Sequence, residues 1–205
     1  MTTQTFFPTR VYTAVLQRAG AAQFNRRLLR ECQQIRHDDA VGRKWSAKSY
    51  PGGYTSYASQ CRLHTRSPMF EQLARKLDPH VNNFVRELEL DLTVRPLAMT
   101  DCWINIMPTS VVHGLHLHPH ATISGTYYVQ TPKDAPGLKL EDPRLDRLMA
   151  APPRKRGSRK DNQLWVTLPA TAGQVVLFES WLRHEVVPNQ SSGERVSISF
   201  NYNWF

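Results

Sequence analysis

The C-terminal stretch Arg195–Trp204, with the sequence RVSISFNYNW, decides the fold class. Polar and apolar side chains alternate along it without a break. Successive side chains of a β-strand point to opposite faces, so this alternation is typical of a strand. The stretch therefore predicts a long strand with one buried face.

Short stretches of the same kind follow one another from Thr100 onward. They are rich in β-branched and aromatic residues and are bounded by Gly, Pro, Asn or Ser. We expect strands at residues 100–107, 114–119, 122–130, 137–140, 164–168 and 174–178, in addition to 195–204. About seven or eight short strands without intervening helices favour a sandwich or jelly roll.

The first half of the chain has a different pattern. Residues 7–16 predict a strand, and residues 21–36 predict a helix because apolar side chains recur at helical spacing. Residues 45–57 contain Pro51-Gly52-Gly53, which marks a turn, and we expect them to be irregular. A second helix is expected from Pro68, the favoured first helical position, to a break at Asp78-Pro79, with another helical stretch at 81–88.

Together these patterns predict a mainly β, α+β fold in which helices pack on one sheet of a jelly roll. We expect a single domain, residues 1–205. Residues 1–99 would form a helical support with a leading strand, and residues 100–205 the jelly-roll core. A chain of 205 residues is of the size that one hydrophobic core can support.

Composition excludes several classes of protein. No apolar run approaches the roughly 20 residues that a membrane-spanning helix needs, and the N-terminus does not have the pattern of a secretory signal. The three cysteines are odd in number and far apart, so they indicate neither a disulfide framework nor a zinc ribbon. We therefore expect a cytoplasmic protein that does not bind a membrane.

The formal net charge of +9 raises the question of an acidic partner. Five of the positive charges lie within residues 153–160, PRKRGSRK, which we expect to be an exposed loop. A role in nucleic-acid binding is the less favoured interpretation, because no aromatic side chains for base stacking lie among these charges.

Histidines are concentrated in one segment: four of the eight lie between His113 and His120. On a strand, His116 and His118 would lie on the same face and could both bind one metal ion. His184, which follows an apolar strand, is the candidate third ligand. An alternative pairs His118 with His120 and leaves His116 outside the ligand set; we favour His116 because Pro119 should end the strand.

Arg195 and Ser197 form a second pair on one face of the last strand. A guanidinium matches a carboxylate in two parallel hydrogen bonds, and a nearby hydroxyl can add another. The pair would suit a dicarboxylic co-substrate that reaches from the metal to Arg195. The alternative is a structural arginine that pairs with an acidic neighbour.

Several segments in order carry a resemblance to a known family: Trp103-Ile104-Asn105, His116-Leu117-His118-Pro119, Ser124-Gly125-Thr126-Tyr127-Tyr128-Val129, Glu141-Asp142-Pro143-Arg144, Phe178-Glu179-Ser180-Trp181-Leu182-Arg183-His184 and Arg195-Val196-Ser197-Ile198-Ser199-Phe200-Asn201. This set resembles an uncharacterised bacterial and phage branch of the 2-oxoglutarate/Fe(II) oxygenase superfamily, distantly similar to prolyl 4-hydroxylases. It covers roughly residues 103–204.

The resemblance implies a double-stranded β-helix, a cupin-like jelly roll, with Fe(II) as cofactor and 2-oxoglutarate as co-substrate. It implies metal ligands at His116, His118 and His184, which would be the catalytic centre. It also implies co-substrate contacts at Arg195 and Ser197, with Tyr128 and Asn105 as further candidates. The superfamily's usual triad has a carboxylate at the position of His118. The histidine at this position is typical of the branch that the chain resembles.

The function expected from the resemblance is that of an oxygenase, most simply a hydroxylase. It would couple oxidative decarboxylation of 2-oxoglutarate to succinate and CO2 with oxidation of an unidentified substrate. Alternatives are a three-histidine dioxygenase that does not use 2-oxoglutarate and a non-catalytic jelly-roll binding module. The expected partner is a small-molecule or peptide substrate, with an acidic one favoured by the basic loop; a homodimer is the default assembly.

Overall fold

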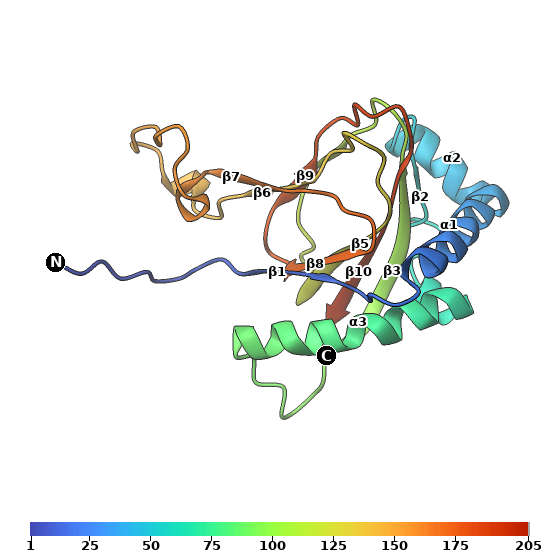
Figure 1. Ribbon diagram of the computed structural model, residues 1–205, viewed down its shortest axis with the longest axis horizontal. Coiled ribbons are helices and arrows are strands. Elements are labelled where there is room, and N and C mark those ends of the chain that lie inside the picture. The colour runs from blue at the N-terminus through green and yellow to red at the C-terminus, as the bar shows by residue number, and fades with distance from the viewer. Residues whose placement is uncertain (205) are drawn as a thin grey trace.

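Two antiparallel β-sheets lie face to face, and three α-helices pack against the outer face of the larger sheet (Figure 1). This computed structural model describes residues 1–204. The six-stranded sheet has the order β1-β8-β5-β10-β3-β2, and the four-stranded sheet the order β4-β9-β6-β7. The architecture is the predicted α+β jelly roll with its helices on one sheet.

The strands of the larger sheet are β1 (Val11–Val15), β2 (Tyr54–Thr55), β3 (Ala98–Met107), β5 (Ile123–Gln130), β8 (Gln174–Glu179) and β10 (Arg195–Asn203). Those of the smaller sheet are β4 (His113–His116), β6 (Leu138–Glu141), β7 (Trp165–Leu168) and β9 (His184–Val186). The sequence did not predict β2 or β9, which have only two and three residues. Phe205, the last residue of the predicted jelly-roll core, lies outside the described residues.

Strand β10 is central, since it pairs with β3 on one side and β5 on the other. Its apolar residues, such as Ile198 and Phe200, pack in the core beneath the helices. Its polar residues, such as Ser197 and Ser199, line a cavity between the two sheets. Both faces are therefore buried, and the prediction of one buried face was wrong: the polar face lines the interior of the sandwich.

Helix α1 (Ala21–Asp38) confirms the prediction, with Phe24, Leu28 and Cys32 buried. Helix α2 (Ala40–Ser49) begins after Asp39, whose carboxylate accepts a hydrogen bond from the Gly42 N–H at 2.9 Å. The prediction that residues 45–57 are irregular was wrong for 45–49. Only Gly42 and Ser46 of α2 are buried, so the helix has no apolar stripe by which to recognise it.

Helix α3 (Pro68–Leu88) is one continuous helix, and the predicted break at Asp78-Pro79 was wrong. Pro79 removes one backbone donor, but the apolar stripe continues past it in register. The buried residues of this stripe are Phe70, Leu73, Leu77, Val81, Phe84 and Val85. Packing against the six-stranded sheet thus outweighs the local preference of proline. Within residues 1–204, no helix combines the length and apolar character needed to cross a bilayer.

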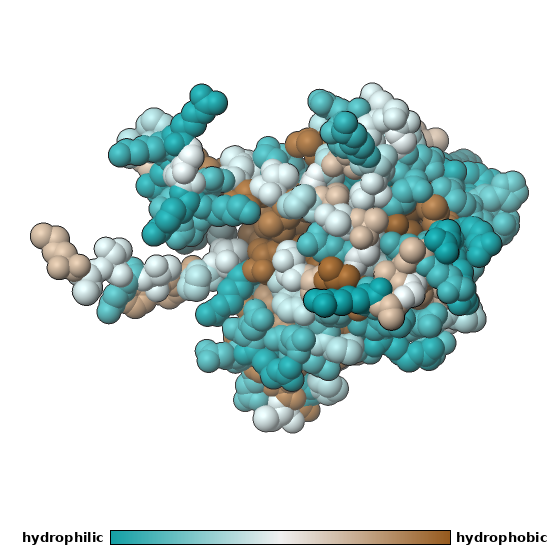
Figure 2. All heavy atoms as spheres, viewed as in Figure 1, coloured by the Kyte–Doolittle hydropathy of each residue, from teal (hydrophilic) through white to brown (hydrophobic). Residues whose placement is uncertain are grey.

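The N-terminal segment and the hairpin formed by β6 and β7 project from the same side of the sandwich (Figure 1). The predicted first strand, residues 7–16, begins only at Val11, and the residues before it line a recess of about 770 Å³ opposite the hairpin. Figure 2 shows apolar surface in this recess. The apolar residues that line the recess include Val11, Leu140, Val166, Leu168 and Leu182. The basic loop 153–160 lies in the hairpin and is almost wholly exposed, as predicted.

Candidate metal and co-substrate site

Three imidazoles from different segments meet between the two sheets. His116 ends β4 and lies directly opposite His184, the first residue of the neighbouring strand β9. His118 lies just beyond β4, where its backbone N–H donates to the carbonyl of Ser180 at 3.0 Å. The expectation that both residues of the HxH pair lie on one strand was therefore wrong, because β4 ends at His116.

The three side chains nevertheless form one cluster. One ring nitrogen of each lies within 4.8 Å of those of the other two. The ring centroids are 4.3 Å apart for His116 and His184, 5.1 Å for His118 and His184, and 5.2 Å for His116 and His118. His120 is exposed and lies outside this cluster.

Each ring has its Nδ1 atom engaged by the protein. Nδ1 of His116 lies 2.7 Å from the carbonyl oxygen of Gly114, and Nδ1 of His184 lies 2.9 Å from that of Leu182. A carbonyl oxygen only accepts, so each Nδ1 is the protonated, donating nitrogen. The Nε2 lone pair of each ring is consequently free to bind a metal ion.

His118 reaches the same tautomer through side chains. Its Nδ1 lies 2.8 Å from Oδ1 of Asn201 and 2.7 Å from Oγ of Ser124. The Asn201 amide donates to a carboxylate oxygen of Asp101 at 3.3 Å, which turns its own oxygen toward His118. The chain Asp101–Asn201–His118 therefore orients this ring as well.

Desolvation keeps these rings neutral. It lowers the pKa of His184 to about 3 and that of His118 to about 4, and neighbouring His116 lowers both further. The pKa of His116 is lowered by the same desolvation. Neutral imidazole is the form that binds a metal ion. Three imidazoles that present free nitrogens to one point suit a divalent ion such as Fe(II), so the residues present fit the metal.

Arg195 is the second feature of the site. Only 2% of this residue is exposed, yet its guanidinium has no carboxylate partner among the described residues. Nε donates to the carbonyl of Pro136 at 3.0 Å, and Nη1 donates to Oγ of Ser197 at 3.2 Å and approaches the Met107 sulfur at 3.5 Å. Nη2 has no protein acceptor within residues 1–204. A buried, unpaired cation is costly unless an anion joins it.

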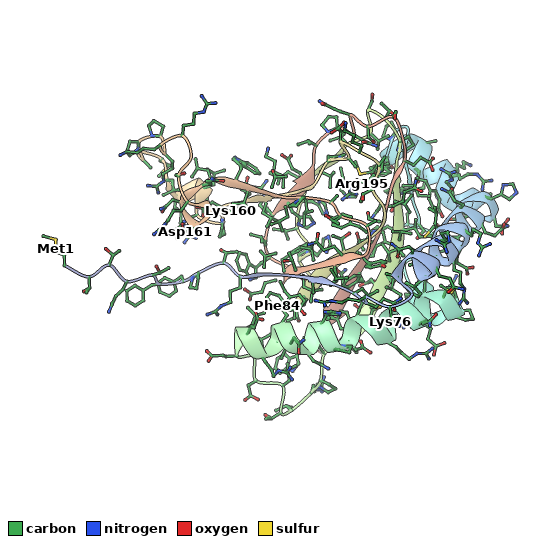
Figure 3. All side chains as sticks on the ribbon, viewed as in Figure 1. Met1, Lys76, Phe84, Lys160, Asp161 and Arg195 are labelled. Carbon is green, nitrogen blue, oxygen red and sulfur yellow. The ribbon has the colours of Figure 1, made fainter. Side chains whose placement is uncertain are left out.

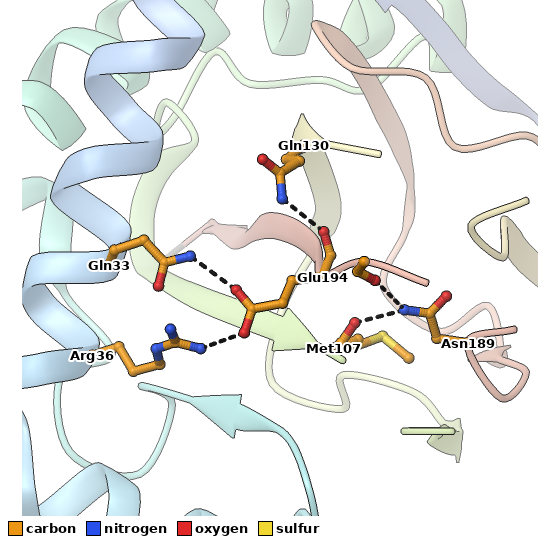
Figure 4. Close-up of polar contacts among 7 residues, drawn as sticks. Gln33, Arg36, Met107, Gln130, Asn189 and Glu194 are labelled. Carbon is orange, nitrogen blue, oxygen red and sulfur yellow. Dashed lines mark hydrogen bonds and ion pairs between the residues drawn. The ribbon is translucent and has the colours of Figure 1, made fainter. Parts of the chain in front are cut away.

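Figure 3 shows Arg195 well away from the projecting hairpin of Lys160 and Asp161. It lines the same cavity as the three histidines. The adjacent Glu194 holds the start of β10 against α1: its carboxylate accepts from Arg36 at 2.7 Å and from Gln33 at 3.0 Å (Figure 4). Its backbone carbonyl accepts from Gln130 at 2.9 Å. These contacts fix the position from which Arg195 extends.

Of the other predicted co-substrate residues, Ser197 and Tyr128 lie beside this guanidinium, and Asn105 lines the same cavity. Ser197 accepts from Arg195, so its own proton is free for a ligand. The Tyr128 ring lies 5.0 Å from the Arg195 guanidinium carbon, and its buried hydroxyl has no partner among the described residues. Asn105 lines the cavity, donates to Ser199 at 3.0 Å, and leaves its buried Oδ1 without a partner in that same part of the chain.

Sequence reasoning missed two residues of this region. His113 lines the cavity, with its ring 4.7 Å from that of His116, and desolvation lowers its pKa to about 3. Tyr50 packs edge-on against His113 at 5.3 Å. The cluster of histidines in the sequence could have indicated His113. Tyr50 lies in a segment without a signal for a binding site.

Comparisons with known proteins identify a family for part of the chain and solved structures that share its fold. Residues 101–201 match the sequence profile of a family described as "Putative 2OG-Fe(II) oxygenase". No curated protein sequence matches the chain. Among solved structures, a Pseudomonas putida prolyl-4-hydroxylase is similar, with a TM-score of 0.65, 16% identity, and coverage of 96% of this chain and 94% of the other.

Two further structures share the fold. HygX from Streptomyces hygroscopicus, solved with nickel, 2-oxoglutarate and hygromycin B, aligns with a TM-score of 0.62 and 18% identity over 96% of this chain and 83% of its own. The non-haem α-ketoglutarate-dependent epimerase SnoN from nogalamycin biosynthesis aligns with a TM-score of 0.66 and 15% identity over 96% and 77%. Through residues 101–201, the chain belongs to the 2-oxoglutarate/Fe(II) oxygenases, enzymes whose cofactor is Fe(II) and whose co-substrate is 2-oxoglutarate.

Proposed function

We propose that this chain is a hydroxylase in which His116, His118 and His184 bind Fe(II) and Arg195 binds the distal carboxylate of 2-oxoglutarate. One observation carries the proposal: a buried guanidinium without an acidic partner lines the same cavity as three neutral imidazoles. A structural arginine, the alternative considered from the sequence, would need a carboxylate neighbour. A dicarboxylate that spans from metal to guanidinium supplies one.

When bound, the iron and 2-oxoglutarate would activate O2, which is the oxidant: one oxygen atom would enter succinate as 2-oxoglutarate loses CO2, and the other would oxidise the substrate. The protein's own residues position the ion and the co-substrate and exclude water from the site. The three Nε2 atoms hold the ion, while Arg195, Ser197 and Tyr128 fix the far end of the co-substrate. Around the histidines, Trp103 and Phe178 contribute apolar wall that excludes water: the Trp103 ring lies 5.7 Å from that of His118, and the Phe178 ring 4.7 Å from that of His184.

The recess between the N-terminal segment and the β6–β7 hairpin is our candidate for substrate entry. It and the cavity lie on two sides of the segment 178–184: Phe178 and His184 line the cavity, whereas Trp181 and Leu182 line the recess. A recess of about 770 Å³ suits a small molecule or a peptide segment.

Charge in the recess is mixed. Arg144 pairs with Asp142 at 2.8 Å, and Arg159 pairs with Asp161 at 3.0 Å. These pairs offset two of the positive charges that would otherwise attract an acidic substrate. The proposal therefore names a small-molecule or peptide substrate without requiring it to be acidic.

The test is anaerobic addition of Fe(II) and 2-oxoglutarate, with observation of the visible charge-transfer band and then of succinate on admission of O2. Wild type should show both. Arg195→Met should bind Fe(II) but need at least about 30-fold more 2-oxoglutarate, because it loses hydrogen bonds to a charged group. Arg75→Met, at an exposed arginine of α3, is the control and should match wild type.

The outcome also separates the rival chemistry. If Arg195→Met binds 2-oxoglutarate as tightly as wild type, the clamp is wrong. If wild type consumes O2 with a substrate while 2-oxoglutarate has no effect, the chain is a three-histidine dioxygenase that does not use this co-substrate.

A further inference from the structure

Tyr50 lies at the end of α2, where the helix cap and the following turn fix its position. It is the C-terminal cap residue of that helix, and its N–H donates to the carbonyl of Ser46 at 2.8 Å. The turn Pro51-Gly52-Gly53 follows. A Cβ on Gly53 would lie 2.5 Å from Cε1 of the Tyr50 ring, so the backbone of the turn lies directly against the ring. Only glycine leaves room for the tyrosine here.

The ring belongs to the core between the two sheets, not to the core beneath the helices. It shares that cluster with Met107 and Tyr128, both of which contact or face Arg195. On another side it meets the edge of His113, which lines the cavity. Tyr50, from the N-terminal half of the chain, thus packs directly behind His113, which lines the same cavity as Arg195.

The Tyr50 hydroxyl is buried and has no hydrogen-bond partner anywhere in residues 1–204. The Tyr128 hydroxyl is in the same condition. Buried hydroxyl groups are nearly always paired in native structures, since leaving them unpaired costs stability. Two hydroxyl groups without partners, near a guanidinium that has no carboxylate partner among the described residues, are the complement of a carboxylate. Burial raises the pKa of Tyr50, and the positive charge of Arg195 opposes this rise, which agrees with their proximity.

We propose that the Tyr50 hydroxyl donates to the distal carboxylate of 2-oxoglutarate, beside Arg195 and Tyr128; this inference rests on the function proposed above. Tyr50 is then a binding residue at the C-terminal cap of α2, outside the segment 101–201 that matches the oxygenase family. Co-substrate binding would satisfy groups that the free protein leaves unpaired. The helical half of the chain would thus contribute directly to the site.

The test compares Tyr50→Phe with Tyr54→Phe, a matched variant four residues away. Tyr54 is also buried, but its hydroxyl donates to the carboxylate of Asp39 at 2.8 Å. For each variant we would measure the melting temperature without 2-oxoglutarate and the dissociation constant of 2-oxoglutarate on Mn(II)-loaded protein by calorimetry. Pyruvate, which keeps the keto acid but lacks the distal carboxylate, is the second probe.

Tyr50→Phe should melt no lower than wild type, because it removes an unpaired hydroxyl, and should bind 2-oxoglutarate about tenfold more weakly. Its affinity for pyruvate should be unchanged. Tyr54→Phe should show the opposite pattern, a lower melting temperature with wild-type affinity for 2-oxoglutarate.

The inference is overturned if Tyr50→Phe binds 2-oxoglutarate as wild type does, or if it loses affinity for pyruvate to the same degree. Failure of the proposed function looks different. In that case Mn(II)-loaded wild type itself would not bind 2-oxoglutarate, or Arg195→Met would bind it unchanged.

Discussion

In the proposed site, His118 stands where the superfamily's usual triad has a carboxylate, and its hydrogen bonds orient the ring for a metal ion. Asn201, oriented by Asp101, accepts from Nδ1 and leaves Nε2 for the metal. A neutral third ligand leaves one more positive charge on the site than a carboxylate would. Since 2-oxoglutarate is a dianion, this charge should favour its binding.

Removing the Asn201 acceptor should weaken metal binding without unfolding the site. Asn201→Ala takes away the group that orients the His118 ring, and loss of such an outer contact typically costs 10- to 100-fold in metal affinity. We expect the Fe(II) or Mn(II) dissociation constant to rise by about tenfold, measured by calorimetry under anaerobic conditions.

Asn203→Ala is the control for this prediction. Asn203 lies two residues further along β10 and donates to Thr100 at 2.8 Å. Among the described residues it makes no hydrogen bond to any of the three histidines. It should retain wild-type metal affinity. Equal losses in the two variants would mean that β10 as a whole, not the contact to His118, sets the affinity.

The candidate site was predictable to the extent that its chemistry needs unusual residues. Three histidines and an arginine are conspicuous in a sequence, and the structure brings His116, His118 and His184 into one cluster. Tyr50 was not predictable in the same way. A tyrosine before a turn is common, and only burial without a partner distinguishes it.

At the scale of the element, local rules failed where packing opposed them. Proline usually ends a helix, but α3 continues through Pro79 because buried residues such as Leu77 and Val81 remain in register on both sides. In β10, alternation correctly predicted the strand but not the burial of its polar face. A polar face that lines an internal site has the same periodicity as one that faces water, so sequence pattern cannot separate the two.

Pro79 should therefore be a source of strain that the fold tolerates. Pro79→Ala restores a helical hydrogen bond and relieves a steric clash, while it gives the unfolded chain more freedom. We expect a net gain of about 2 kcal/mol in the free energy of unfolding, measured by urea titration. Pro68→Ala, at the first helical position where proline is favourable, should bring no gain or a small loss. If both variants change stability equally, the helical geometry at Pro79 is not strained.

At the scale of the whole molecule, one core mainly stabilises the fold and the other surrounds the candidate site. The larger core lies between the helices and the six-stranded sheet and gathers most of the buried apolar residues. The space between the sheets contains a smaller core together with the histidines and Arg195. Burial in the larger core can offset the unfavourable polar groups of the smaller one. Functional sites commonly carry such local costs at the expense of stability.

This division has a consequence for stability against acid. His113, His118 and His184 have folded-state pKa values of about 3, 4 and 3, whereas an unfolded histidine titrates near 6.5. As pH falls below about 6.5, these histidines become protonated in the unfolded chain but stay neutral in the folded protein, so the free energy of unfolding must decrease. At pH 5 the loss is up to about 2 kcal/mol for each such group.

For metal-free protein we expect the urea midpoint to fall steadily from pH 7 to pH 5, and saturating Mn(II) at each pH to raise it, because the ion binds only the folded state. His113→Gln should reduce the pH dependence of the urea midpoint, because it removes one histidine whose pKa is lowered in the folded protein. A midpoint that stays constant between pH 7 and 5, or an equally steep fall in His113→Gln, would show that the buried imidazoles do not control acid stability. In that case, keeping these imidazoles neutral for metal binding would not lower the stability of the metal-free protein at acid pH.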